Sequence, residues 1–381
     1  MMKRLESRKT ILVTFCVILF VLALGSIVYA VEENWDEIIA KAKEEGKVVT
    51  YNTSGRMAEA GEAFEKKYGI KVESLKIGDA EITDRIIREK QAGLNEVDLI
   101  MSEDIIGVNK QMIPAGYVSS YFPGIYQDII LEEYRDPLVF LLQGRTLGYN
   151  SEEYAETPIE SLWELTTKEW EGRFFLRDPE LTPTTVAFMS EIVIRSEEMA
   201  AEYERFFGKP IELTTPNAGW ELIKGLAENK PVTFRSDGNT SEAVGARGQK
   251  NSPIGLYATG KHRPDILETQ NLALKPCIGV KPVIGFVYPA YILQVANAPH
   301  PNAAKLFTRF LLEEEGALAW TTDPGCFSTN PNVSSFPVTP ADGLNPIGGV
   351  KEWAKVTWPL NPENTVLYSR DVLDFWVRYR K

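Results

Sequence analysis

Histidine is nearly absent from this chain of 381 residues, which contains only His262 and His300. Both lie beside prolines or basic residues, in segments typical of loops. The sequence therefore offers few histidines for a Ser-His-Asp triad or for a histidine-based metal site. The G-x-S-x-G and H-E-x-x-H motifs are absent as well, which removes the usual sequence signals of serine hydrolases and zinc proteases.

Cysteine is also scarce. Cys16 lies near the N-terminus, and only Cys277 and Cys326 follow it. The spacing of these two matches no zinc or redox motif. A disulfide between them, as an exported protein allows, and two separate buried thiols are both open interpretations.

Long apolar runs are absent except at residues 11–30, which carry no charge. Basic residues precede this run, at Lys3, Arg4, Arg8 and Lys9. Val28 and Ala30 occupy the −3 and −1 positions of a cleavage site before Val31. The arrangement predicts a secretory signal at 1–30, which places the rest of the chain in the periplasm or another extracytoplasmic compartment. An N-terminal membrane anchor is the alternative, because about 20 apolar residues can cross a bilayer.

Basic residues are outnumbered, with 41 Lys and Arg against 53 Asp and Glu and a net charge of −12. Residues 1–30 contribute four basic and one acidic side chain, so the remaining chain is near −15. This charge argues against nucleic acid and anionic membrane surfaces as partners. About 351 residues follow the predicted signal, too many for one compact core and suited to two lobes.

Segments of strand and helix character alternate along the chain. Strands are expected at 47–51, 70–77, 97–101, 173–178, 231–234 and 254–257, with a strand pair in 138–150 and a strand-rich stretch at 283–296. Helices are expected at 33–45, 57–68, 79–90, 162–170, 182–195, 241–247 and 301–316. The alternation predicts an α/β protein with a mixed, mostly parallel sheet flanked by helices.

Small polar residues follow several predicted strands, at the edge of an open α/β sheet where ligands bind. They are Thr53 and Ser54, Ser102, then Thr182, Thr184 and Thr185, and finally Asp237, Asn239, Thr240 and Ser241. Helix N-termini at such turns offer free N–H groups to an anionic or polar ligand. Ordinary helix capping uses the same residue types and is the alternative at each single turn.

Four further side chains are candidates for ligand contact. Arg56 and Arg177 can pair with an anion, with a local ion pair as the alternative. Tyr257 and Tyr288 lie at strand ends near glycine and can stack on a ligand, with core packing as the alternative. Asp79 and Glu81 open a predicted helix, so capping is the expected role there.

Ordered segments throughout the chain after residue 30 carry a family resemblance. They read KVVTYNTSG, AFEKKYGIKVE, EVDLIMSED, LGYNSEEY, LWELTTKEWEGRFFLRDP, GWELIKGLAENKP, SEAVGARG and AAKLFTRFLLEEEGALAW. In this order the chain resembles the bacterial periplasmic solute-binding proteins of ABC importers. The similar branch contains binders of ferric iron, thiamine, phosphonates and sugar phosphates.

The resemblance implies a type II periplasmic-binding-protein-like fold with two lobes and a hinge between them. Lobe 1 is expected at 31–145 plus 284–345, lobe 2 at 146–283, and a C-terminal helical segment packing on a lobe at 346–381. The resemblance also implies no catalysis, no cofactor and no metal site. Partners would be a small-molecule solute and the membrane permease subunits, with the receptor itself a monomer.

The family's cleft loops correspond to particular residues here. The first is Asn52, Thr53, Ser54 and Gly55, the second Ser102, Glu103 and Asp104, and the third Thr182, Pro183 and Thr184. Pro183 replaces a glycine and removes one N–H donor. Ala258 follows Tyr257, so the adjacent tyrosines of ferric binders are missing. The leading expectation is a phosphorylated or otherwise polar organic solute, with Thr53 and Asp237 facing the cleft from opposite lobes.

Three alternatives stay open at this point. The first is a ferric-iron-binding protein of the same fold. The second is an exported hydrolase such as a glycosidase, whose two carboxylates no motif can exclude. The third is a sensory ectodomain held by an uncleaved segment at 11–30.

Overall fold

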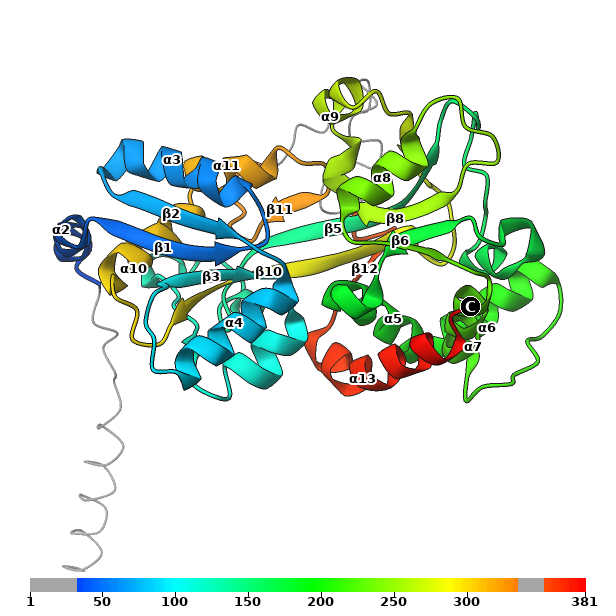
Figure 1. Ribbon diagram of the computed structural model, residues 1–381, viewed down its shortest axis with the longest axis horizontal. Coiled ribbons are helices and arrows are strands. Elements are labelled where there is room, and N and C mark those ends of the chain that lie inside the picture. The colour runs from blue at the N-terminus through cyan, green and yellow to red at the C-terminus, as the bar shows by residue number, and fades with distance from the viewer. Residues whose placement is uncertain (1–32, 335–352) are drawn as a thin grey trace, which may run out of the picture. The chain divides into compact units, whose positions relative to one another are not determined.

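The computed structural model describes residues 33–334 and 353–381 of the chain (Figure 1). By its contacts the chain divides into two units, Met1–Trp35 and Asp36–Lys381, and the sheet and pocket described below belong to the second. The predicted signal at 1–30 with Cys16, and residues 335–352, lie outside the described residues. Among the described helices, none combines the length and apolar character that crossing a bilayer requires.

One mixed sheet forms the centre of the second unit. Its strands are β1 (Lys47–Asn52), β2 (Lys71–Lys76), β3 (Leu99–Ser102), β4 (Val118–Ser119), β5 (Val139–Asn150), β6 (Phe174–Arg177), β7 (Val232–Phe234), β8 (Ile254–Ala258), β9 (Leu274–Pro276), β10 (Gly285–Val295), β11 (Cys326–Ser328) and β12 (Thr357–Pro359). The main order is β2-β1-β3-β10-β5-β8-β6-β7. β9 and β11 pair with β5, and β4 and β12 pair with β10.

Two groups of parallel strands flank the long antiparallel pair β5 and β10. β1 pairs in parallel with β2 and β3, and β6 pairs in parallel with β7 and β8. β10 is antiparallel to β3 and β5, and β5 is antiparallel to β8. The mixed α/β character predicted from the alternating segments is therefore confirmed.

The predicted lobe boundaries, at 145/146 and 283/284, fall in or next to the two long strands. β5 contains the first boundary, and β10 begins directly after the second. Each parallel group pairs with one of these strands, so both groups belong to one continuous hydrogen-bonded sheet. The division into two lobes with a hinge stays a prediction.

Helices flank the sheet on both faces (Figure 1). They are α2 (Trp35–Glu45), α3 (Arg56–Tyr68), α4 (Asp79–Gln91), α5 (Pro183–Ile194), α6 (Ser196–Phe207), α7 (Ala218–Glu228), α8 (Asp237–Gly245), α9 (Pro264–Thr269), α10 (Pro301–Leu311), α11 (Glu314–Thr321) and α13 (Pro362–Tyr379). Short turns are the π-helical η1 (Gly107–Met112) and the 3₁₀ turns η2 (Gly124–Tyr126), η3 (Glu132–Tyr134), η4 (Leu162–Thr166), η5 (Lys168–Trp170), η6 (Pro179–Leu181) and η7 (Thr259–His262).

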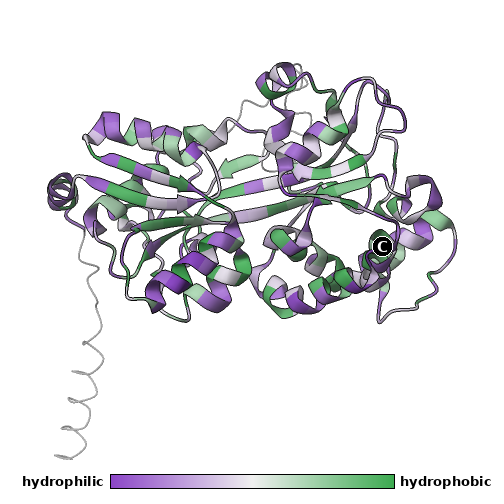
Figure 2. Cartoon of the chain, viewed as in Figure 1, coloured by the Kyte–Doolittle hydropathy of each residue, from purple (hydrophilic) through white to green (hydrophobic). Residues whose placement is uncertain are grey.

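Amphipathic spacing explains how the helices pack. In α3, Met57, Ala60 and Phe64 are buried and lie on one helical face. The ring of Phe64 meets that of Phe307 in α10 at a centroid distance of 4.9 Å. Gly69 ends the helix in the left-handed conformation, at φ 72°, where its N–H donates to the Glu65 carbonyl. Figure 2 shows hydrophobic and hydrophilic residues alternating along such helices.

The C-terminal helix α13 packs against α5 and α7. Val372 and Trp376 are fully buried there. The ring of Phe375 meets that of Trp220 in α7 at 4.7 Å. The described end of the predicted segment 346–381 thus covers helices that follow β6.

The segment 138–150 is one continuous strand, β5, where the sequence predicts a strand pair. Gly144 and Gly148 lie within this strand and serve close packing. A Cβ at Gly148 would lie 1.9 Å from the Tyr257 hydroxyl oxygen, and one at Gly144 would lie 2.9 Å from the Thr259 methyl carbon. These glycines make room for neighbouring side chains.

Two predicted helices are interrupted. The stretch 162–170 forms η4 and η5, because Thr167 between them is extended and donates its hydroxyl to the Glu164 carbonyl. The stretch 301–316 divides into α10 and α11. A Cβ at Gly316 would lie 2.0 Å from the Phe310 carbonyl oxygen, so the two helices meet backbone to backbone at this break.

Three further differences concern helices that follow β6. The helix predicted at 241–247 begins earlier, at Asp237, because Ser236 caps it. Helices α6 and α7 were not indicated by the pattern.

Cys277 and Cys326 are both buried and free, which decides between the open interpretations in favour of separate thiols.

Candidate functional site

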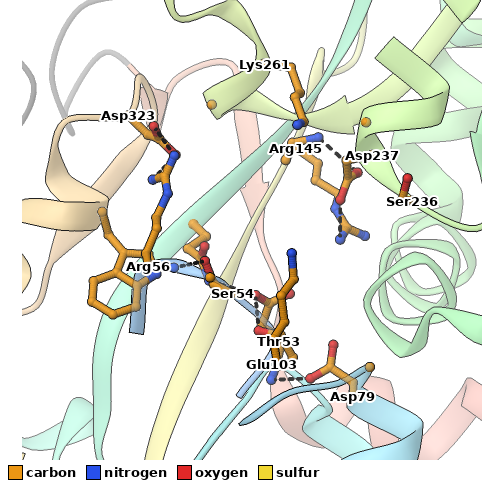
Figure 3. Close-up of a pocket in the computed structure, with 18 of the residues that line it drawn as sticks. Thr53, Ser54, Arg56, Asp79, Glu103, Arg145, Ser236, Asp237, Lys261 and Asp323 are labelled. Carbon is orange, nitrogen blue, oxygen red and sulfur yellow. Dashed lines mark hydrogen bonds and ion pairs between the residues drawn. The ribbon is translucent and has the colours of Figure 1, made fainter. Parts of the chain in front are cut away.

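A pocket of about 760 Å³ opens where strands of both parallel groups end (Figure 3). Much of its lining comes from the turns that follow β1, β2, β3, β7 and β8, together with the last residue of β6. The long strands add Gln143 and Arg145 of β5 and Tyr288 of β10, and Trp320 and Asp323 at the end of α11 complete one side. In open α/β sheets this carboxyl edge of the strands is where ligands bind. The pocket therefore lies at the edge where the sequence predicts a ligand cleft.

Six predicted binding residues line this pocket: Thr53, Ser54, Gly55, Glu103, Asp237 and Tyr288. The two candidate arginines, Arg56 and Arg177, line it too, as does Asp79. Thr53 follows β1 and Asp237 follows β7, so each parallel group contributes to the lining.

Nine predicted binding residues lie outside the pocket lining: Asn52, Ser102, Asp104, Thr182, Thr184, Thr185, Asn239, Thr240 and Tyr257. Most of them satisfy local backbone or strand contacts. The Asn52 amide donates to the Ser74 hydroxyl at 2.8 Å and so ties β1 to β2. Asp104 accepts from the Gly107 N–H at 2.8 Å, which is a capping role.

Two of these outside residues belong to the capped start of α8, and a third lies in the core. The Asn239 N–H donates to the Ser236 hydroxyl at 3.1 Å, and the Thr240 hydroxyl donates to the Ser236 carbonyl at 3.0 Å. Tyr257 is fully buried and packs with Val244, among other apolar side chains. The capping and core-packing alternatives therefore describe the observed contacts of these residues.

Several pocket residues were not indicated by the sequence pattern: Lys76, Gln143, Arg145, Ser236, Lys261 and Asp323. Lys76 ends β2 and Lys261 follows β8, so their positions after strands carried a usable signal. Arg145 interrupts the apolar run LVFLLQGRTLGYN. A charge within a buried strand is costly unless it is paired. Arg145 was therefore recognisable from the sequence as a residue that needs an acidic partner or ligand.

Arg145 and Arg177 converge on one carboxylate. Arg145 donates to Asp237 Oδ2 at 3.2 Å, and Arg177 donates to the same oxygen at 3.4 Å. Burial opposes ionisation of Asp237, but the charges of both arginines lower its pKa. Thr184 accepts from the second guanidinium nitrogen of Arg145 at 2.6 Å. Two guanidinium groups sharing one carboxylate leave this wall with excess positive charge.

Glu103 and Asp79 form a second cluster. Glu103 Oε1 accepts from the Thr53 hydroxyl at 3.2 Å and from the Gln143 amide at 3.0 Å. The Glu103 N–H donates to Asp79 Oδ1 at 2.7 Å. Burial and the adjacent charge of Glu103 raise the pKa of Asp79 to about 8. Asp79 therefore keeps its proton to an unusually high pH.

Arg56 is held in a local ion pair. Its guanidinium donates to Asp323 Oδ1 at 2.7 Å, and Arg263 donates to the same oxygen at 3.3 Å. The two partly buried positive charges are shared by one carboxylate. The local-pair alternative therefore describes Arg56 in this structure.

Two lysines on the pocket lining have no partner. Within the described ranges the ammonium group of neither Lys76 nor Lys261 makes a hydrogen bond or ion pair. Ser236, Asp237 and Gly238, at the N-terminus of α8, line the same pocket. A helix N-terminus carries partial positive charge and N–H donors, which favour anions.

Tyr288 lies almost completely inside the protein, with 3% of its surface exposed, and lines the pocket. Its hydroxyl has no hydrogen-bond partner in the part of the chain that the structure describes. The Arg145 guanidinium lies 5.2 Å from the ring centroid. Burial raises the pKa of Tyr288 well above its usual value, so the phenol is neutral at physiological pH.

Acidic and histidine side chains do not gather into a metal-binding group here. Among the described residues, no three His, Cys, Asp or Glu side chains are placed to hold a metal ion. Of the two candidate tyrosines, only Tyr288 reaches the pocket.

Solved structures of bacterial binding proteins share this fold. Iron-bound HitA from Pseudomonas aeruginosa matches with a TM-score of 0.66 and 18% identity, over 87% of this chain and 99% of that one. AfuA from Actinobacillus pleuropneumoniae, with fructose-6-phosphate bound, matches with a TM-score of 0.64 and 18% identity, over 88% of this chain and 98% of that one. A substrate binding protein of an ABC transporter from Agrobacterium tumefaciens matches with a TM-score of 0.64 and 18% identity, over 88% of this chain and 94% of that one. The predicted type II periplasmic-binding-protein-like fold class is therefore confirmed.

Sequence comparison identifies the family. No curated protein matches the chain. The family model of bacterial extracellular solute-binding proteins, however, matches residues 59–346, which is more than half of the sequence. That range contains most of the segments that surround the pocket, from Lys76 at the end of β2 to Asp323 after α11. The chain therefore belongs to the bacterial extracellular solute-binding protein family.

Proposed function

We propose that this protein is the solute receptor of an ABC importer and that it captures a small phosphorylated or otherwise anionic organic solute. It acts as a monomer in the periplasm or another extracytoplasmic compartment, with the permease subunits in the membrane as partners. Family membership supports the receptor role. The pocket volume of about 760 Å³ lies within the range of small-molecule sites.

The excess positive charge around Asp237 carries this proposal. Arg145, Arg177 and Lys261 surround one carboxylate, and the N-terminus of α8 adds its N–H groups at the same place. A phosphate or phosphonate accepts hydrogen bonds from such donors in several directions. The Lys261 ammonium group is free to bind the anion, because its side chain has no partner among the described residues.

The ferric alternative has less support from the pocket. Ferric binding through paired phenolates needs two tyrosines, and Tyr257 lies in the core beside Val244. Tyr288 is held in its neutral form by burial, which disfavours a phenolate ligand. Asp237 and Asp323 are already engaged by arginines.

Capture would follow from contacts on both parallel groups of strands. An anion bound at Lys261 and α8 leaves Thr53 and Lys76, after β1 and at the end of β2, to add contacts from the other group. A ligand that binds the closed form better raises its population by that difference in affinity. The closed form then docks on the permease, and the solute is passed on unchanged.

Calorimetric titration with glucose 6-phosphate, glucose and ferric citrate tests this proposal. Glucose 6-phosphate should bind and glucose should not, because only the ester supplies the charge. Lys261→Met should weaken binding roughly tenfold or more, about 1.4 kcal/mol. Lys250→Met is the matched control, since Lys250 is exposed and outside the pocket lining.

Two results would contradict the proposal. One is ferric citrate binding with full affinity while glucose 6-phosphate does not bind. The other is equal binding of glucose and its phosphate ester. Turnover of a sugar substrate that contains a glycosidic bond, at catalytic protein concentration, would instead favour the hydrolase alternative.

A further inference from the structure

The pocket carries opposite charges on two sides. Figure 3 shows Arg145, Asp237 and Lys261 on one side and Glu103 and Asp79 on the other. The first side holds three cations around one carboxylate. The second side holds the Asp79 carboxyl, which accepts from the Glu103 backbone N–H, and the Glu103 carboxylate, which accepts from Thr53 and Gln143. A solute that fills the pocket therefore meets donors at one end and carboxyl groups at the other.

The carboxyl groups of the second side have only neutral partners in the described chain. Glu103 accepts from a threonine hydroxyl and a glutamine amide, and Asp79 accepts from the Glu103 N–H and, at 3.4 Å, from the Ser102 hydroxyl. Each residue is only 7% exposed. Buried carboxylates normally pair with a cation, because desolvation otherwise disfavours their charge.

Tyr288 gives an independent sign that a ligand belongs here. Its side chain is almost fully buried and lines the pocket, and its hydroxyl is unpartnered in the described ranges. Its phenol is influenced by the charges of Glu103, Arg145, Asp237 and Arg177, so it lies within reach of both sides. The Tyr288 hydroxyl can therefore donate to, or accept from, a ligand in the pocket.

We propose, building on the anionic solute proposed above, that the solute also carries an ammonium group, which binds between Asp79 and Glu103. Its phosphate or phosphonate binds at Lys261 and the N-terminus of α8. The Tyr288 hydroxyl then contacts the part of the solute that joins the two groups. The pocket thus selects an amino-bearing phosphate ester or phosphonate over one that carries only hydroxyls.

Proton release is a second consequence of this arrangement. The charged groups that act on Asp79 are Glu103, Asp104 and Arg177, and the net result keeps a proton on Asp79 at neutral pH. An ammonium group placed beside the two carboxyls favours their charged forms. Binding of an amine-bearing solute should therefore release a proton, whereas a hydroxyl-bearing solute should not.

The test compares glucosamine 6-phosphate with glucose 6-phosphate, which differ by an ammonium group in place of one hydroxyl. Titration of the full protein in two buffers of different ionisation enthalpy gives both the affinity and the number of protons released. We expect glucosamine 6-phosphate to bind at least roughly tenfold more tightly and to release a proton. Glu103→Gln should bring the affinities for the two esters close together. Glu81→Gln, an exposed residue of α4 outside the lining, is the control.

The outcomes separate the two proposals. Equal affinities without proton release would overturn the ammonium subsite and leave the anionic receptor intact. Binding of neither phosphate ester would overturn both. A preference for glucosamine 6-phosphate that Glu103→Gln leaves unchanged would place the amine elsewhere and overturn the subsite. The wild-type proton count needs no variant, so a folding defect in Glu103→Gln cannot obscure the result.

Discussion

Arg145 shows how one buried side chain organises the pocket wall. With 2% of its side chain exposed, it donates to Thr184 and to Asp237, and its guanidinium lies over the ring of Tyr288. Thr184 was predicted as a ligand contact, yet its observed contact is the arginine. Thr184 lies outside the pocket lining, yet by accepting this hydrogen bond it helps to orient the Arg145 guanidinium inside the pocket.

Asp79→Asn should change how stability depends on pH. The folded state holds a proton on Asp79 up to a pKa of about 8, while an unfolded aspartate releases it near 3.8. The folded state therefore binds more protons than the unfolded state in this window, and Asp79 lowers stability as pH rises through it. The asparagine variant lacks this decline. Its stability relative to the native protein should rise between pH 5 and 8, by up to about 1.4 kcal/mol per pH unit.

Urea unfolding of both proteins at several pH values measures this difference. The matched variant Asp84→Asn changes an exposed carboxyl of the same helix and should give a curve parallel to that of the native protein. Parallel curves for Asp79→Asn as well would show that Asp79 ionises in the folded state as an ordinary carboxyl.

The residues after the strands divide into pocket residues and caps, and their residue types do not separate the two. Thr53 and Asp237 reach the pocket, while Asp104 and Asn239 serve neighbouring backbone or side-chain groups. Capping and ligand binding use the same oxygen atoms, so only the direction of the side chain distinguishes them. The sequence therefore predicts the edge where the pocket opens better than it predicts the individual contacts.

At the scale of elements, periodicity predicted many of the strands and helices, and glycines lie at two of the places where the prediction was wrong. Gly144 and Gly148 lie in the segment that was predicted as a strand pair, and within the single strand β5 they allow close packing. Gly316 was the last residue of the helix predicted at 301–316, and in the structure it lies in α11, where it allows two helices to meet. Glycine is used both at turns and at close contacts, and the second use depends on a partner distant in sequence.

Gly219→Ala in α7 tests this close packing. Alanine favours helix over glycine by about 1 kcal/mol, so an unhindered site would gain stability. At Gly219, however, a Cβ would lie 2.3 Å from the Ile192 carbonyl oxygen of α5, which is backbone and cannot turn aside. We expect a net loss of about 1–3 kcal/mol in the free energy of unfolding.

Gly225→Ala is the control on the same helix. Its added Cβ would meet the Thr166 methyl carbon at 2.8 Å and the Thr166 Cβ at 2.9 Å, which are side-chain atoms rather than the backbone of a packed helix, so the loss should be smaller than at Gly219. Chemical unfolding of both variants decides the point. A Gly219→Ala protein that is as stable as the native one would mean that α5 and α7 lie farther apart than described.

At the scale of the whole molecule, the net charge is negative while one side of the pocket is positive. The chain carries −12, yet Arg145, Arg177 and Lys261 gather around a single carboxylate. Cationic groups in a cleft with low-dielectric walls focus their field on it, which would favour the proposed anionic solute despite the negative net charge.

The identity of the bound solute is the most direct test of the account. Native mass spectrometry of the protein, purified without denaturation from the cells that make it, gives the mass that copurifies, and elemental analysis gives phosphorus and iron per chain. We predict one bound phosphorus-containing solute per protein monomer and no stoichiometric iron. One iron per chain without phosphorus, or a bound solute that lacks any anionic group, would contradict the proposal that this pocket captures a phosphorylated solute.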